Sequence, residues 1–562
     1  MFDLFIASSM EKIMPERHYN GKRTSNFSAL KGETVSFQVV FACDEQDIYN
    51  FKFECATLDE IKAYFVKNVP VNYAAHKRSL DDKNYISHEP GLFPDLLEPA
   101  DRNWAYVNDI YHSIWITVKP KAGDHCLSVN FTDSDGNIAA TASAKIHIID
   151  LDIPKQELIY TQWFHVDCLA DYYGYQIFSE ELWDMTEKYL RTAYDNGINM
   201  ILTPIFTPPL DTAVGHERST VQLVKIMKDA ERYTFDFSLL RRWISICQNI
   251  GFEYFEMPHL FAQWGVEATP KITAIVDGKE KEIFGWHTKP QSVEYDNFLA
   301  QFLPALINEL KTDGIFGNTY FHITDEPVED KISSYDTVKK IALKYLSGCK
   351  IIDAVSEIAA NENMVGIPIP STTLLARKQC FCPKERWCYY CNADCVGVSN
   401  RFVAMPSARN RSIGFQLYKF KIHGFLHWGY NFYYSRFSLL KLNPFLENDA
   451  YGAFPSGDSV SVYPGKDGPL PSIGLMVFNE ALQDLRALKL LESYIGYDAV
   501  IDLLEHEVKS EIKFDRCFSA DDLISARAAV NKKLECFCTA SVNKIHKPIA
   551  ELIDGNVAMA KV

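Results

Sequence analysis

The heptapeptide Phe321-His322-Ile323-Thr324-Asp325-Glu326-Pro327 decides how this sequence is interpreted, because a short apolar run leads directly into two adjacent carboxylates and a proline. Two neighbouring carboxylates repel each other, so one of them keeps its proton more tightly than in water, which suits a general acid. The triplet Asp-Glu-Pro is also an ordinary helix start, with aspartate as the cap and proline in the first turn. The surrounding sequence has to distinguish these two interpretations.

From about residue 157 onward, short apolar segments alternate with amphipathic helices, which is the pattern of parallel βαβ units. Eight strands are predicted, near Ile159–His165, Asn199–Thr203, Glu253–Met257, Thr319–Asp325, Lys350–Val355, Met364–Ile369, Arg386–Cys391 and Gly424–Trp428. Helices between them are predicted at Ser179–Asn196, Phe237–Ile250, Val293–Leu310 and Val328–Leu346. Eight units in about 270 residues match the size of a (β/α)8 barrel, so the predicted fold class is α/β with a TIM-like barrel.

The sequence divides into three predicted domains. Residues 1–155 resemble a β-sandwich, with β-rich runs at Thr34–Phe41, Ser113–Val118, Cys126–Phe131 and Ala144–Ile149 and a hairpin turn at Asp135-Gly136. Residues 156–475 form the catalytic barrel. Residues 476–562 form a C-terminal helical region, since Leu482, Leu485, Leu488 and Leu491 recur at helical spacing and Ser519 to Asp522 suit a helix cap.

Composition narrows the class of partner. The chain has 562 residues and a net charge of −16, which argues against nucleic acid or an anionic membrane as the main partner and favours a neutral substrate. The N-terminus has no basic region followed by a long apolar core, so no secretory signal is predicted. The 14 cysteines are scattered, as in reduced cytoplasmic proteins, and a cytoplasmic location is expected. Composition does not determine the oligomeric state.

The acid pair falls at the end of the fourth predicted strand, and barrel active sites lie at the C-terminal ends of the strands. This position reconciles the helix-cap and catalytic interpretations. In a strict strand, however, His322, Thr324 and Glu326 share one face, while Ile323 and Asp325 share the other. A twist or bulge must therefore turn Asp325 inward if both carboxylates are to contact one ligand.

Aromatic and polar side chains gather at the same predicted rim, as sugar binding requires. The predicted substrate-binding residues are His165, Asp167, His259, Gln263, Trp264, His322, Tyr390, Trp428, Tyr430 and Asn431. Single members also have structural interpretations: Trp163 and Tyr389 suit wall packing, and His165 and His259 suit interior histidines. The long connections Phe206 to Phe235 and Phe261 to Pro290 determine how the pocket closes, and hence whether chain ends or internal bonds are cut.

Two sets of residues raise the question of a metal. Cys380, Cys382, Cys388, Cys391 and Cys395 form a cluster, and Cys388-x-x-Cys391 has a permitted zinc spacing. These thiols also suit a buried strand as small hydrophobes. His165, Asp167 and His259 could bind a metal or equally recognise hydroxyls. No cofactor and no metal are predicted.

Several motifs together resemble glycoside hydrolase family 123, also known as the domain of unknown function 4091 family. They are Phe321–Pro327, Trp387–Cys391, Gly424–Asn431 and Val462–Gly465, with Gly32–Phe41 in the sandwich. The sequence departs from the family downstream, where Gly474–Glu480 and Gln483–Leu485 replace an arginine-rich helix start and an acidic Asp-Tyr pair. That departure concerns the C-terminal contacts and the identity of the substrate.

The resemblance implies a β-N-acetylgalactosaminidase that acts by retaining, substrate-assisted catalysis on an oligosaccharide or glycoconjugate. In that mechanism the acetamido oxygen of the sugar attacks the anomeric carbon, and no protein carboxylate does so. By motif position, Glu326 would be the general acid and then the base, Asp325 would orient the acetamido group, and Tyr463 would join the substrate-binding set. The galacto or gluco preference depends on contacts to one hydroxyl, which the sequence leaves open.

Two alternatives remain at this point. A conventional retaining glycosidase needs a second carboxylate about 5 Å from Glu326, and Asp167 is the best candidate in the sequence. A catalytically inactive carbohydrate-binding protein would keep the pocket without turnover, although the intact Asp325-Glu326 pair argues against it.

Overall fold

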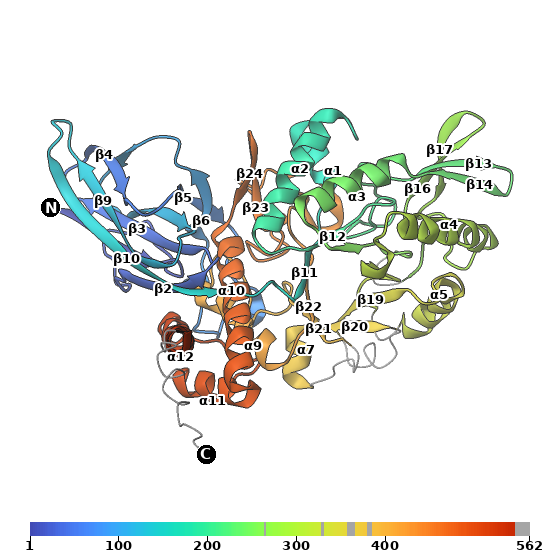
Figure 1. Cartoon of the computed structure of the whole chain (residues 1–562). Coiled ribbons are helices and arrows are strands. Elements are labelled where there is room, and N and C mark those ends of the chain that lie inside the picture. Colours follow the sequence, from blue (N-terminus) through green and yellow to red (C-terminus); the bar gives the residue numbers. More distant parts are fainter. Residues whose placement is uncertain (263–265, 328–330, 357–365, 379–384, 546–562) are drawn as a thin grey trace, which may run out of the picture.

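The computed structural model describes residues 1–262, 266–327, 331–356, 366–378 and 385–545, with side chains described up to residue 538. Strands β1 to β10 form one lobe, and the parallel strands that follow form a second (Figure 1). Helices α10 (Ile473–Ile495), α11 (Tyr497–Glu507) and α12 (Ala520–Ile545) lie close to both lobes. Among the described residues, no helix combines the length and apolarity needed to cross a bilayer.

The N-terminal lobe consists of two five-stranded sheets. In spatial order, one sheet contains β1 (Phe2–Ser8), β3 (Val35–Cys43), β8 (His112–Val118), β5 (Ile61–Val71) and β6 (Gly91–Pro99). The other contains β2 (Asn26–Lys31), β10 (Ile138–Asp152), β9 (Gly123–Thr132), β4 (Asp47–Glu54) and β7 (Trp104–Val107). Alternate side chains such as Phe37, Val39, Val129 and Phe131 fill the space between the sheets. The expected β-rich N-terminal region is confirmed.

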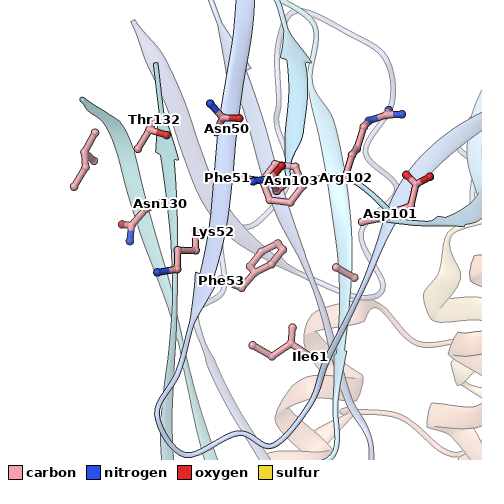
Figure 2. A pocket seen from close by; sticks show the side chains of 13 residues that line it. Asn50, Phe51, Lys52, Phe53, Ile61, Asp101, Arg102, Asn103, Asn130 and Thr132 are labelled. Carbon is pink, nitrogen blue, oxygen red and sulfur yellow. The ribbon is translucent and has the colours of Figure 1, made fainter. Parts of the chain in front are cut away.

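A hollow of about 940 Å³ lies on this lobe, beside β4. Because side chains alternate along a strand, Asn50 and Lys52 lie on one side of β4, and Phe51 and Phe53 lie on the other (Figure 2). Asp101 is the only carboxylate among the lining residues. The hollow therefore lacks an acid pair and lies on a different lobe from the predicted one.

Eight parallel strands form the centre of the second lobe, in a nearly closed barrel that is consistent with the predicted TIM-like fold. Their order around the sheet is β20 (Ile367–Pro370), β19 (Lys350–Val355), β18 (Thr319–Phe321), β15 (Tyr254–Glu256), β12 (Met200–Leu202), β11 (Ile159–Gln162), β22 (Gly424–His427) and β21 (Trp387–Tyr389). A parallel bridge between Ser371 and Tyr389 connects the two end strands. Met200, Leu202, Tyr320 and Ile352 pack together with one another in a buried cluster.

Each predicted strand segment overlaps one of these strands, but the fourth strand is shorter than expected. Its pairing with β15 ends at Tyr320 and its pairing with β19 ends at Phe321, whereas the apolar pattern predicted a strand through Asp325. Helices accompany the strands: α1 (Val166–Tyr173), α2 (Glu180–Asp195), α3 (Ser238–Ile250), α4 (Val293–Thr312), α5 (Ile332–Tyr345), α7 (Thr372–Arg377), α8 (Ser407–Arg411) and α9 (Ile413–Lys419). Ser179 and Ser292 cap α2 and α4 by accepting backbone N–H groups.

Two long connections contain strands that the sequence analysis treated as loops. Strands β14 (Arg232–Asp236), β13 (Lys225–Asp229), β16 (Ile272–Val276) and β17 (Lys279–Phe284) form a small sheet beside the barrel. Its β13 and β16 come from different connections and pair in parallel, an interaction that no local pattern reveals. Strands β23 (Val462–Gly465) and β24 (Gly468–Pro471) form a separate hairpin.

A buried charge network joins the C-terminal helices to the sandwich. The Arg527 guanidinium on α12 donates to Asp484 at 2.8 Å and also pairs with Glu33 of the sandwich. Arg411 donates to Asp484 at 2.7 Å and to Glu480 at 2.8 Å, both on α10. The expected boundary near residue 475 falls inside α10, so this helix belongs to both regions.

We expect Arg527→Ala to lower the free energy of unfolding by about 3–5 kcal/mol, because it leaves Glu33 buried without its cation. Chemical denaturation measures this loss. Lys532→Ala, an exposed position on the same helix, is the matched control and should change stability by less than about 0.5 kcal/mol. Equal losses in the two variants would contradict a role for the network.

Candidate active site

The chain leaves the barrel strand β18 because a side chain takes over a backbone hydrogen bond. Asp353, on the neighbouring strand β19, accepts the Ile323 N–H at 2.8 Å and the His322 Nδ1–H at 3.3 Å. The ladder with β19 ends at Phe321, while the His322 and Ile323 carbonyls still accept the N–H groups of Leu260 and Phe261 in the connection after β15. With the ladder lost on the β19 side, the following residues are no longer held to the strict alternation of a strand. The required turn at the strand end is therefore present, and Asp353 stabilises it.

The turn brings Asp325 and Glu326 into one pocket. Glu326 has a φ of +41°, a left-handed conformation that non-glycine residues seldom adopt outside turns and functional sites. The pocket is lined by Trp163, Leu210, Asp211, Asp325, Glu326, Ala354, Tyr389, Cys391, Asn392, Leu426, Trp428 and Phe454. These residues come from the strand ends and the connections that follow them, which is the usual location of a barrel active site.

The two adjacent carboxylates differ in environment. Burial and the neighbouring Glu326 charge hold the pKa of Asp325 well above its usual range, and the cationic His322 opposes this shift. Glu326 is more exposed, and its Oε1 accepts a hydrogen bond from the Tyr389 hydroxyl. Without a ligand, the two carboxyl groups therefore favour holding one proton between them. That proton resides on Asp325, and Glu326 acts as the hydrogen-bond acceptor.

Two tryptophans form aromatic walls of the pocket, and each is fixed by a buried carboxylate. The Trp163 indole N–H donates to Glu256 Oε1 at 2.7 Å, and the Trp428 indole N–H donates to Asp458 Oδ2 at 3.0 Å. A buried indole needs such a partner, and the bond fixes the plane of the ring. Rigid aromatic faces beside carboxylates suit the C–H surface and the hydroxyls of a sugar.

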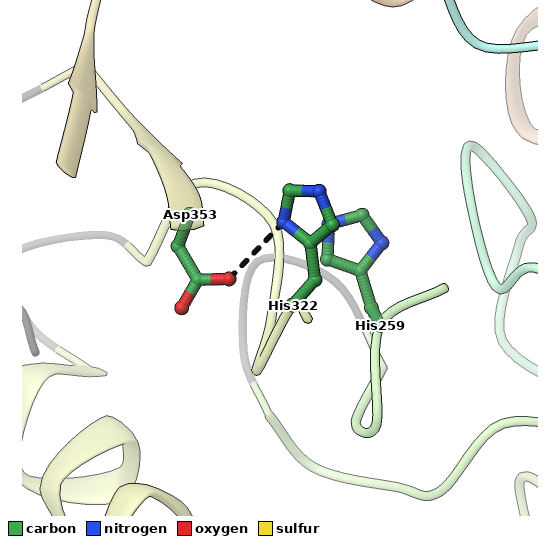
Figure 3. A group of neighbouring side chains, drawn as sticks. All are labelled: His259, His322 and Asp353. Carbon is green, nitrogen blue, oxygen red and sulfur yellow. Dashed lines mark hydrogen bonds and ion pairs between the residues drawn. The ribbon is translucent and has the colours of Figure 1, made fainter. Parts of the chain in front are cut away.

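His322 lies at the centre of a charge network behind the pocket. Its Nε2 donates to Glu256 at 2.6 Å, while its Nδ1 faces Asp353 (Figure 3). Burial alone would lower the pKa of His322, but the hydrogen bonds to Asp353 and Glu256 outweigh it and raise the pKa to about 9. At neutral pH a cationic His322 between two buried carboxyl groups thus connects the turn after β18 to the Trp163 wall.

The same network is the one place in the described part of the chain where histidine and carboxylate atoms cluster as metal ligands might. One atom each of His259, His322 and Asp353 lies within 4.8 Å of the others. The two imidazole rings overlap, with centroids 4.3 Å apart and a 34° tilt, as Figure 3 shows. Imidazole binds a metal in the plane of its ring, so overlapping rings do not converge on one ion, and both nitrogens of His322 already have partners. The cluster fits a charge network better than a metal site.

Two residues predicted to bind substrate lie behind the pocket wall. Asp167 accepts from the Arg218 Nε at 2.6 Å and from its terminal nitrogen at 2.8 Å, in a buried bidentate pair. His165 also contacts this guanidinium, at 3.0 Å, and contacts the Trp428 carbonyl at 3.3 Å. Because Arg218 occupies both groups, they do not line the pocket, and the metal interpretation of His165, Asp167 and His259 is disfavoured.

Most of the other predicted residues also have internal partners. The Tyr390 hydroxyl donates to Asn410, that of Tyr430 to the Tyr189 carbonyl, and that of Tyr463 to Asp95 of the sandwich. Asn431 forms two hydrogen bonds with the His165 backbone. His259 and His322 are buried and contact the Trp163 ring. Among the predicted residues that are described, Asp325, Glu326 and Trp428 line the pocket. Gln263 and Trp264 lie outside the described residues.

The sequence analysis did not identify three polar or aromatic lining residues: Asp211, Asn392 and Phe454. Asp211 and Phe454 lie in long connections without periodicity, so no pattern marks them. Asn392 directly follows the predicted seventh strand, and that position was a usable signal.

The cysteines that are close in the sequence lie in different places in the structure. Cys391 lines the pocket, while Cys388 is buried in β21. Burial raises the pKa of both thiols well above the usual range. Protonated, buried thiols act as small hydrophobes and bind metals poorly. Cys380 and Cys382 lie outside the described residues.

We expect His322→Gln to remove a pH-dependent part of the stability. The folded pKa of about 9 exceeds the unfolded value of about 6.5, so the stabilisation is complete below pH 6.5 and is lost as pH rises through 9. The difference in unfolding free energy between wild type and variant should therefore shrink by roughly 3 kcal/mol between pH 6.5 and 9.5. His18→Gln, an exposed control, should parallel the wild type, and parallel curves for His322→Gln would contradict the assignment.

Comparisons with known proteins agree with this geometry. A family model described as the glycoside hydrolase 123 catalytic domain matches residues 163–491. A solved family 123 glycoside hydrolase from Clostridium perfringens aligns with a TM-score of 0.70 and 16% identity, over 97% of this chain and 100% of that one. No curated protein matches the sequence at a significant level.

More distant solved structures share little with the chain. β-Glucuronidase 3 of Bacteroides uniformis aligns with a TM-score of 0.30 and 10% identity, over 82% of this chain and 51% of that one. A Parabacteroides merdae β-glucuronidase gives a TM-score of 0.29 at 10% identity, over 81% and 51% of the two chains. The family model spans more than half of the chain and includes the strands that carry the acid pair. The chain belongs to glycoside hydrolase family 123.

Proposed function

We propose that this protein releases a β-linked N-acetylgalactosamine, or a related 2-acetamido sugar, by a retaining and substrate-assisted mechanism. The observation that carries the proposal is the position of Asp325 and Glu326, two adjacent residues that line the same pocket. Adjacent carboxylates can contact neighbouring groups of one sugar, namely the acetamido group and the glycosidic oxygen. A conventional retaining enzyme places its two carboxylates on opposite sides of the scissile bond.

The shared proton of the pair suits this mechanism. In the free site, burial and the Glu326 charge favour the proton on Asp325. An acetamido N–H that donates to Asp325 would stabilise its ionised form, and the proton would then reside on Glu326. Glu326 would protonate the leaving oxygen, the acetamido oxygen would attack the anomeric carbon, and the resulting oxazoline would be opened by water that Glu326 deprotonates.

The pocket also favours an uncharged sugar. Asp211, Asp325 and Glu326 line it, and the described lining residues include no lysine, arginine or histidine. An anionic sugar would place its charge beside these carboxylates without a counter-ion. Trp163 and Trp428 provide the aromatic faces that the ring of a neutral sugar needs.

The similar Clostridium perfringens enzyme supports the choice of a glycoconjugate substrate, since that enzyme is described in connection with glycolipid glycan hydrolysis. The conventional two-carboxylate alternative loses its earlier candidate, because Asp167 is held by Arg218 behind the wall. Asp211 is the other carboxylate among the described lining residues and replaces Asp167 in that alternative.

We expect 4-nitrophenyl N-acetyl-β-galactosaminide to be hydrolysed and the matching β-galactoside, which lacks the acetamido group, to be almost inert. The physical reason is that the nucleophile belongs to the acetamido sugar. Initial rates on the two substrates, with a thiazoline mimic of the oxazoline as inhibitor, measure the difference. Equal rates on both glycosides would disprove substrate assistance.

The same assay assigns the acid. Glu326→Gln should retain the wild-type unfolding midpoint and lose about 10²–10⁴-fold in turnover of substrates with poor leaving groups. Glu280→Gln, an exposed glutamate in β17, is the matched control and should keep full activity. A sharply lower unfolding midpoint in Glu326→Gln would instead indicate a structural role.

We expect Asp325→Asn to lose most turnover, because an asparagine amide cannot carry the charge that stabilises the developing oxazolinium. Added azide should not yield a glycosyl azide of inverted configuration, since Asp325 does not form the covalent bond to the sugar. Product analysis by NMR distinguishes the cases, and detection of the inverted azide would assign Asp325 as the nucleophile.

A further inference from the structure

Asp211 is a third carboxylate in the pocket and has no place in the proposed mechanism. It lies in the connection after β12, whereas the acid pair follows β18, and β15 separates these two strands in the barrel. Its side chain is almost buried, with 8% exposed. Burial raises the pKa of Asp211 to about 6, against the opposing effects of the Phe437 N–H and the Arg218 and Arg436 charges. The site thus retains a costly buried acid that requires an explanation.

The backbone around Asp211 is strained in a way that fixes the carboxylate. Asp211, Phe437 and Ser438 have φ values of +41°, +61° and +55°, left-handed conformations that non-glycine residues seldom adopt. Two hydrogen bonds join the segments: the Phe437 N–H donates to Asp211 Oδ2 at 3.0 Å, and the Ser438 hydroxyl donates to the Asp211 carbonyl at 2.6 Å. Strain of this kind persists where the surrounding structure enforces it, most often at ligand sites.

A second anchor fixes the residue before it. The Arg218 guanidinium donates to the Leu210 carbonyl at 3.0 Å while it is held by both oxygens of Asp167. Arg218 thus has its own carboxylate partner, and its bidentate ion pair is not with Asp211. The buried ion pair instead fixes the loop on which Asp211 reaches the pocket.

We propose that Asp211 is a further substrate-binding residue, which accepts a hydrogen bond from a ring hydroxyl of the sugar and so determines which sugars are turned over. A carboxylate has about four acceptor positions, so Asp211 can accept the Phe437 N–H and a ligand donor at the same time. Sugar hydroxyls are donors that match such an acceptor, and a buried charged acceptor discriminates strongly against a ligand that lacks the donor. This inference rests on the proposed function, because it assumes that a sugar occupies the pocket.

The test compares wild type and Asp211→Asn on 4-nitrophenyl N-acetyl-β-galactosaminide and its 3-, 4- and 6-deoxy analogues. Asparagine tolerates a positive φ and keeps an oxygen for the Phe437 N–H, so the loop should remain folded. We expect the wild type to lose about 10–150-fold in kcat/KM on one analogue, the value of a hydrogen bond to a charged group. Asp211→Asn should lose a similar factor on the parent sugar and little more on that same analogue.

Two controls make the result specific. Asp229→Asn, an exposed aspartate in the same connection, should match the wild type on every sugar. Asp211→Asn should retain the wild-type unfolding midpoint, which separates lost binding from lost folding. The inference is overturned if Asp211→Asn loses the same factor on the parent and all analogues, because Asp211 would then act without contacting a ring hydroxyl.

A further experiment with azide tests whether Asp211 is instead the nucleophile. An inverted glycosyl azide formed by Asp211→Asn would make Asp211 the nucleophile of a conventional mechanism and would overturn the inference. Failure of the proposed function gives a different pattern, namely wild-type hydrolysis of the acetamido-free galactoside at an equal rate. In that case the deoxy series of the galactoside tests Asp211 in the same way.

Discussion

The site depends on one hydrogen bond, the bond by which Asp353 accepts the Ile323 N–H. A continued strand would place Asp325 and Glu326 on opposite faces. Because a side chain of β19 replaces the next ladder bond, the chain leaves the sheet after Phe321 and reaches the left-handed conformation at Glu326. Both carboxylates then line one pocket, which is the arrangement that the proposed substrate-assisted mechanism needs and that a conventional pair across a sugar does not have.

Buried charged residues behind the pocket stabilise this turn. His322 lies between Glu256 and Asp353, and Glu256 also fixes the Trp163 wall. The opposite wall is held in a similar way, since Asp458 accepts the Trp428 indole N–H. Removing one member of such a group leaves a buried charge without compensation, so the network is costly to alter. The aromatic walls are therefore held in place by buried carboxylates without any ligand, as preorganised electrostatic catalysis requires.

A buried ion pair also positions the loop that carries Asp211. The Asp167–Arg218 pair anchors the loop that carries Asp211, although Asp167 itself never reaches the pocket. Asp167 and His322 were both expected to contact substrate because they are polar and lie near strand ends. Each instead positions a group in the pocket wall or a neighbouring loop. Polar residues at a barrel rim thus divide into those that contact the ligand and those that hold the contacting groups in place.

The positions of the eight strands and of the acid pair could be predicted from the sequence, because strand patterning and strand-end position are local properties. The sequence also marked Trp428, which is the last residue of the predicted eighth strand. The inward turn of Asp325, the burial of His322 and the position of Asp211 in the pocket became visible in the folded structure alone. Each of these depends on hydrogen bonds between residues far apart in the chain, such as Asp353 to Ile323 and Phe437 to Asp211, and such partners leave no periodic signal in the sequence.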